Sequence, residues 1–113
     1  MVPALLPCRV ELGFQTITVS EVLDLDPDTA GEYQSASSSI KISAHLLNDL
    51  ARANTLVHEC FHAAFKQSEL GKILDDREGD KEEMIVSVLA NTVVELLRRN
   101  PKLLLFLNSA VRD

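Results

Sequence analysis

Apolar residues at every second position mark the first part of the chain. They form two runs: Val10, Leu12 and Phe14, then Ile17 and Val19. Alternation with polar residues is typical of strands that bury one face, so the pattern predicts one or two strands over residues 8–23. The stretch Ile40-Lys41-Ile42-Ser43 alternates in the same way and predicts a further short strand over residues 40–43.

The segment between these strands is rich in turn-forming and acidic residues. Residues 23–33 include three aspartates at alternate positions, the first of them Asp24. A calcium loop of the EF-hand type starting there would need Gly at its sixth position and Glu at its twelfth, where this chain has Thr29 and Ser35. We therefore predict a solvated acidic loop rather than a calcium site.

An apolar stretch within residues 49–70 predicts the first helix. Its apolar members are Leu56, Val57, Phe61, Ala63, Ala64 and Phe65. Gly71 is a typical stop signal at the end of a helix. The residues that follow, 71–79, are mostly charged and predict a loop.

Apolar residues spaced by three and four positions predict a second helix over residues 80–99. They are Val86, Leu89, Val93 and Leu96. Asn100-Pro101 ends this helix and is typical of the start of another, which we expect to reach about Ala110. The chain has no internal repeat and no linker, so these elements predict one α+β domain over residues 1–113.

Composition and charge narrow the class of partners. Seventeen acidic against 11 basic residues give a net charge of −6, which offers no basic surface to nucleic acid and disfavours binding to anionic membranes. No apolar run is long enough to span a membrane, and residues 1–7 lack the basic region of a signal peptide. Cys8 and Cys60 are far apart and indicate reduced thiols, so we expect a cytoplasmic protein.

The clearest chemical signal is the His-Glu-x-x-His sequence of residues 58–62, within the first predicted helix. Residues four apart lie on the same face of a helix, so His58 and His62 are able to direct two imidazoles to one metal ion. Glu59 then lies beside them as the base that takes a proton from the water that the metal activates. His45 lies outside the apolar pattern and is more typical of a surface histidine.

A catalytic zinc ion normally has three protein ligands, and no histidine follows His62, so the third ligand should be a carboxylate. The candidates are Glu69, Asp75, Asp76, Glu78, Asp80, Glu82 and Glu83. Glu82 lies four residues before Val86, on the apolar face of the second helix. Glu83 lies on the polar side and forms a capping-box pattern with Asp80. The periodicity favours Glu82 as the ligand and leaves Glu83 as the alternative.

The segment around the motif resembles a known group of enzymes. Residues 55–63, Thr-Leu-Val-His-Glu-Cys-Phe-His-Ala, are similar to the TLLHExxHA segment of small phage and prophage-type zinc metallopeptidases, related to the ImmA/IrrE family and to minimal gluzincins. Residues 31–33 with 40–42 resemble the loop and edge strand that precede their motif helix. Residues 82–101 resemble the helix that carries their glutamate ligand, so the similarity covers roughly residues 31–101.

This resemblance implies a zincin-like α+β fold. A small, mostly antiparallel sheet would pack on the HExxH helix, followed by a glutamate-bearing helix and a short C-terminal helix. The resemblance implies a Zn²⁺ ion held by His58, His62 and either Glu82 or Glu83, with Glu59 as the general base.

Metallopeptidases of this architecture bind an extended substrate along an edge strand near the metal. We assign that role to the strand that contains Ile40, Lys41 and Ile42; an internal position for this strand is the alternative. Tyr33, the single tyrosine of the chain, is a candidate donor to the oxyanion of the reaction.

The sequence therefore predicts a zinc-dependent metallopeptidase that cleaves a peptide or protein substrate. One alternative is a non-catalytic, zinc-stabilised interaction module derived from such an enzyme, and another is an α+β domain that binds no metal. The chain departs in one respect from larger gluzincins, and this difference bears on whether the site is catalytic. Larger gluzincins often place an aspartate four residues after the ligand glutamate, where it orients a histidine, and this chain has Val86 or Ser87 there.

Overall fold

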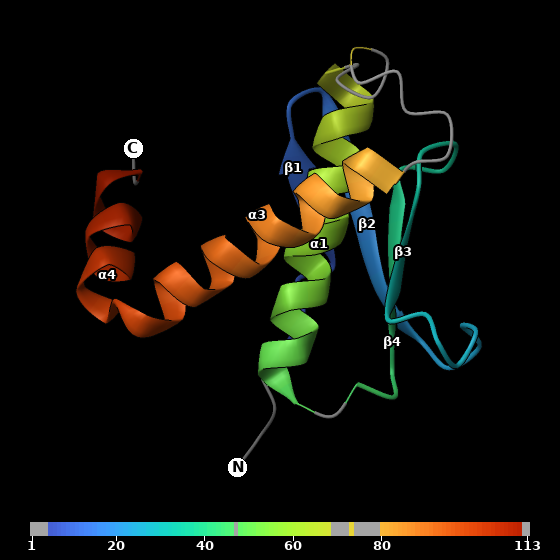
Figure 1. Cartoon of the computed structure of the whole chain (residues 1–113), viewed down its shortest axis with the longest axis horizontal. Helices are drawn as coiled ribbons and strands as arrows, with labels where there is room; N and C mark the ends of the chain where they lie inside the picture. Colours follow the sequence, from blue (N-terminus) through green and yellow to red (C-terminus); the bar gives the residue numbers. More distant parts are fainter. Residues whose placement is uncertain (1–4, 47, 69–72, 74–79, 112–113) are drawn as a thin grey trace.

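Four strands and three helices, in that order, make up the described part of the chain. The computed structural model describes residues 5–46, 48–68, 73 and 80–111 of the 113-residue protein. The strands are β1 (Arg9–Leu12), β2 (Gln15–Val22), β3 (Gly31–Gln34) and β4 (Ser39–Ser43). The helices are α1 (Asp49–Ser68), α3 (Asp80–Arg99) and α4 (Pro101–Ala110). The predicted α+β class is confirmed (Figure 1).

The strands form one sheet in the order β1-β2-β4-β3. The outer pairings, β1 with β2 and β3 with β4, are antiparallel, whereas β2 and β4 pair in parallel with Val19 opposite Ile40. The sheet is therefore mostly antiparallel, as predicted. Residues Gly13 and Phe14 connect β1 to β2, and Gly13 has a φ of 59°, which glycine adopts without steric cost.

The edge of the sheet differs from the prediction. We expected residues 40–43 to form an edge strand, but β4 is hydrogen-bonded on both sides, to β2 and to β3. That prediction is wrong, and the edge beside β4 is β3, where the sequence predicts a loop at residues 31–33. All four residues of β3 are half-buried and show no alternation. These residues form a strand because they pair with β4, and the local sequence has no pattern that indicates this pairing.

One face of the sheet is apolar and carries α1. Ile17 and Val19 of β2, Ile40 and Ile42 of β4, and Ala63 of α1 form a buried cluster. Figure 1 shows α1 lying along the sheet and α3 crossing α1. The motif helix is thus fixed between the sheet and α3, which brings residues of α1, α3 and β3 to one place.

The bounds of the two long helices agree with the periodicity. The predicted second helix, residues 80–99, is α3, and its Val86 and Ala90, one turn apart, are fully buried. The first helix is described to Ser68, and its predicted end at Leu70 lies outside the described residues. The loop predicted over 71–79 also lies outside them, except for Ile73, which is helical.

Helix α4 lies at the far end of α3, away from the sheet (Figure 1), and buries none of its residues. Asn100 occupies the N-cap position of α4, but its side-chain amide donates to the carbonyl of Leu96 at 2.7 Å. The side chain of Asn100 therefore satisfies a backbone carbonyl group at the C-terminal end of α3 and does not cap the N-terminus of α4. Within the described residues, no helix combines the length and the apolar character needed to cross a membrane.

Candidate metal centre

His58 and His62 lie on the side of α1 that meets the first turn of α3. Their ring centroids are 4.9 Å apart with an angle of 65° between the ring planes. Their side chains are 22% and 19% exposed, so both imidazoles are largely shielded from water. The spacing of four residues brings the two rings together on one helical face, as the sequence predicts.

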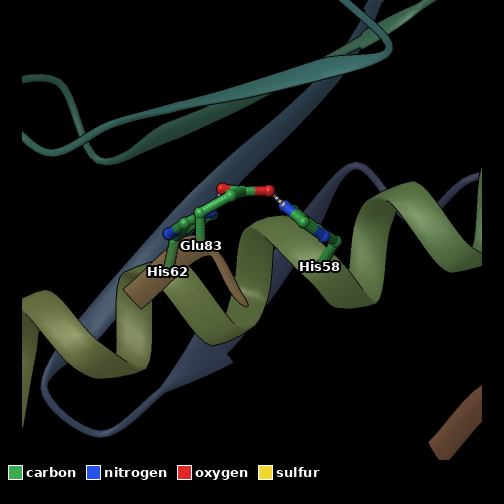
Figure 2. Close-up of side chains that lie close together, drawn as sticks. All are labelled: His58, His62 and Glu83. Atoms are coloured by element: carbon green, nitrogen blue, oxygen red, sulfur yellow. Dashed lines mark hydrogen bonds and ion pairs between the residues drawn. The ribbon is translucent and has the colours of Figure 1, made fainter. Parts of the chain in front are cut away.

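The carboxylate of Glu83 lies between the two imidazoles (Figure 2). Its Oε1 is 2.9 Å from His58 Nε2, and its Oε2 is 2.8 Å from His62 Nε2. One ligand atom from each of the three residues lies within 4.8 Å of the others. Two imidazole nitrogens and a carboxylate are a ligand set that zinc binds in hydrolytic sites, so the three residues form a candidate metal site.

Glu82 contacts the other edge of His62. Its Oε2 is 2.6 Å from His62 Nδ1, the ring nitrogen that does not face Glu83. Glu82 is also the more buried of the two acids, with 25% of its side chain exposed against 54% for Glu83. The periodicity of α3 ranks residues by burial and therefore favours Glu82. The Nε2 atoms of His58 and His62, however, both contact Glu83, which is the more exposed acid and the one that the sequence leaves as the alternative ligand.

Glu59 is buried beside the histidines, with 7% of its surface exposed. Burial raises the pKa of its carboxyl group, and the nearby His62 and His58 oppose that shift only in part. The backbone of Tyr33 on β3 is hydrogen-bonded to this carboxyl group and also lowers its pKa. A carboxyl group with a raised pKa next to two metal-ligand candidates is suited to accepting and returning a proton.

The acidic neighbours also act on His62. Burial lowers the pKa of its imidazole, but the hydrogen bond with Glu82, the charge of Glu59 and the contacts with Glu83 outweigh this effect. The pKa of His62 is therefore raised above its ordinary value of 6.5. A metal ion that binds this ring competes with a proton, so binding strengthens as the pH rises.

A cleft of about 910 Å³ opens beside these residues. The chain from Asp28 to Tyr33, which includes most of β3, lines one part of it. Residues of α1 and the first turn of α3 line the rest, including His58, Glu59 and Glu83. The volume is typical of ligand pockets, and the cleft gives access to the candidate metal site.

Gly31 allows β3 to approach α1 closely. A Cβ atom at this position would lie 2.5 Å from Thr55 Cγ2 and 3.4 Å from Glu59 Cγ. Any larger residue would collide with α1 one turn before the histidines. The sequence predicts a loop at Gly31 and indicates no structural role for this residue. The signal that would have found it is a glycine in a strand, which often marks close approach of another element.

Of the other residues predicted to contact substrate, Tyr33 lines the cleft, whereas Ile40, Lys41 and Ile42 do not. Ile40 and Ile42 are fully buried in the core, and neither they nor Lys41 are among the described residues that line the cleft. Tyr33 lines the cleft, but its hydroxyl group donates to Gln15 Oε1 at 2.9 Å. The backbone of Tyr33, rather than its hydroxyl group, is the part bonded to Glu59.

Three further sequence predictions concern residues that do not belong to the triad of His58, His62 and Glu83. Cys8 and Cys60 are free thiols, as predicted. His45 is exposed and contacts the carbonyl group of Leu23, as expected of a surface histidine. In the acidic loop, the backbone N–H of Asp28 donates to the carboxylate of Asp26.

Comparisons of this chain with protein-family models, curated proteins and solved structures gave no match. The chemistry of the site is therefore the basis of the function proposed for this chain.

Proposed function

We propose that this protein is a zinc-dependent hydrolase that cleaves peptide bonds. The observation that carries the proposal is the convergence of His58 Nε2 and His62 Nε2 on the Glu83 carboxylate, at 2.9 and 2.8 Å. The buried carboxyl group of Glu59 and the open cleft beside this triad favour a catalytic role over a purely structural one. The resemblance of residues 55–63 to small phage-type zinc metallopeptidases of the gluzincin kind supports the same reaction class.

Each residue of the site has a role in this proposal. His58, His62 and Glu83 would hold the ion. When bound, zinc supplies a Lewis acid for the scissile carbonyl group and lowers the pKa of water towards neutrality. Glu59 accepts the proton from the attacking water and later delivers it to the leaving amine. The burial of Glu59 beside the two histidines supports this role, because it holds the carboxyl group next to the candidate metal site.

The substrate would lie along β3. An edge strand offers backbone N–H and C=O groups that an extended peptide is able to pair with. Gly31, Glu32 and Tyr33 line the cleft, and the backbone of Tyr33 is bonded to Glu59. A peptide or protein bound there in an extended conformation would bring a backbone carbonyl group close to the general base.

The test measures zinc content and peptide cleavage on the same preparations. We expect about one zinc ion per chain in the wild type, and cleavage of a mixed peptide library detected by mass spectrometry. Glu59→Gln should keep the zinc ion and lose activity by about 10²–10⁴-fold, because the amide cannot accept the proton. Glu95→Gln, on the surface of α3, is the matched control and should behave as the wild type.

The outcomes separate this proposal from its rivals. Activity that survives in Glu59→Gln would refute the role of the base. A wild type that binds zinc and unfolds on chelation, but cleaves nothing, would instead be a zinc-stabilised interaction module. A wild type that binds no zinc would leave an α+β domain with neither function.

A further inference from the structure

Both ring nitrogens of His62 face carboxylates from α3. Its Nε2 lies 2.8 Å from Glu83 Oε2, and its Nδ1 lies 2.6 Å from Glu82 Oε2. Consecutive residues on a helix point about 100° apart, which allows these two neighbours to reach opposite edges of one imidazole. The first turn of α3 therefore holds the His62 ring from both sides.

The two carboxylates are not equivalent with respect to His58. Glu83 contacts Nε2 of both histidines, and among the described residues it completes the group whose ligand atoms lie within 4.8 Å of one another. Glu82 contacts the nitrogen on the far edge of His62. While it does so, its carboxylate lies behind the ring rather than at the point where the two Nε2 atoms meet.

We propose that Glu82 is a positioning residue that fixes the orientation and the tautomer of His62. Its carboxylate accepts a hydrogen bond from Nδ1–H, so the ring proton stays on Nδ1 and Nε2 keeps its lone pair for the metal. This inference rests on the proposed metal site of His58, His62 and Glu83. It adds a second acid to that site, with a role distinct from that of a ligand.

The surroundings of the Glu82–His62 contact support this role. The side chains of Glu82 and His62 are 25% and 19% exposed, and a charge-assisted hydrogen bond shielded from water is stronger than one at the surface. The contact joins two separate helices, since Glu82 is 20 positions beyond His62. The orientation of the ring is thus tied to the packing of α3 on α1.

The experiment compares zinc binding in four proteins: the wild type, Glu82→Ala, Glu82→Gln and Glu83→Ala. Zinc affinity is measured by competition with a chromophoric chelator, and stoichiometry by elemental analysis. The His62 Nδ1–H proton is followed by ¹H–¹⁵N NMR in the zinc-loaded proteins. This signal reports the tautomer directly, and a residue that merely stabilised the fold would not change it.

Glu82→Ala should still bind one zinc ion, with an affinity about 10–100-fold lower, and its Nδ1–H signal should be lost to exchange with water. Glu82→Gln should keep the signal and most of the affinity, because its amide carbonyl still accepts the hydrogen bond. Glu83→Ala should lose stoichiometric zinc binding, because it removes a ligand. If Glu82→Ala does not fold, the zinc-loaded wild type provides the test, because the inference requires a slowly exchanging Nδ1–H signal there and its absence would refute the inference.

Three further results would overturn the inference. Wild-type affinity in Glu82→Ala, with an unchanged Nδ1–H signal, would show that Glu82 positions nothing. Loss of zinc in Glu82→Ala but not in Glu83→Ala would make Glu82 a ligand, and the proposed zinc function would survive. A wild type without zinc binding would remove the proposed function itself, and the role of Glu82 with it.

Discussion

Because β3 lies so close to α1 at Gly31, replacing this glycine with alanine should destabilise the protein, although the same substitution normally stabilises a strand. In Gly31→Ala, the new Cβ would lie 2.5 Å from Thr55 Cγ2, about 1 Å inside the preferred distance between carbon atoms. Overpacking of this kind costs about 1–3 kcal/mol. In an unobstructed strand the same substitution would stabilise the protein by about 0.5–1 kcal/mol. We therefore expect Gly31→Ala to lower the free energy of unfolding rather than raise it.

Thr55→Ser provides the matched test because it removes the methyl group that the new Cβ would meet. In a double-mutant cycle, Gly31→Ala combined with Thr55→Ser should recover at least about 1 kcal/mol of the loss. Urea unfolding with a chelator present keeps metal binding out of the measurement. Circular dichroism is the suitable probe, since the chain has no tryptophan and one tyrosine.

Two results would refute this reasoning. One is a Gly31→Ala protein at least as stable as the wild type, which would mean that the close approach of β3 to α1 does not require glycine at position 31. The other is additive behaviour of the two substitutions, which would mean that the atoms at positions 31 and 55 do not meet.

Two further predictions concern the α1–α3 contact and the pH. Val86→Ala should lower the free energy of unfolding by about 2 kcal/mol, because it removes buried carbon atoms. Val88→Ala, at a position 61% exposed, should change it by less than about 0.5 kcal/mol in the same urea assay, and equal losses would contradict the packing. The zinc-free protein should lose stability as the pH rises above 6.5, because the raised pKa of His62 means that the folded chain binds this proton more tightly than the unfolded chain. The raised pKa of Glu59 acts in the same direction from its ordinary value of 4.5 upwards. Thermal unfolding in a chelator across this range measures the effect, and a midpoint that rises with pH would contradict the sign.

Periodicity predicted the bounds of the long helices because apolar residues recur every three to four positions along each of them. The predicted stripe of α3 is only partly buried, since Val86 is fully buried whereas Leu89 and Leu96 are exposed. The same reasoning located β1, β2 and β4, whose apolar residues alternate. It missed β3, because Gly31–Gln34 has no alternation and becomes a strand by pairing with β4. It also could not give the order of the sheet, since the parallel pairing of β2 with β4 is a tertiary contact.

The histidine pair of the site was predictable because four-residue spacing on a helix fixes the relation between the two rings. The acidic partners were harder, since two adjacent glutamates differ only in the direction in which each leaves α3. Periodicity favoured Glu82, which contacts Nδ1 of His62, whereas Glu83 contacts the Nε2 atoms of both histidines. The position four residues after the ligand, where larger gluzincins often have an orienting aspartate, holds Val86 or Ser87 in this chain, whereas Glu82 directly precedes Glu83.

The site also spans two distant parts of the chain, because His62 and Glu83 are 21 positions apart. An unfolded chain would have to close that loop before both could bind one ion, at an entropic cost of about 3 kcal/mol. The folded chain has already closed it, through the packing of α3 on α1. Zinc would thus cross-link α1 and α3, as a disulfide bond cross-links two segments of an extracellular domain. The strength of this link would follow the supply of the metal, while Cys8 and Cys60 remain free thiols.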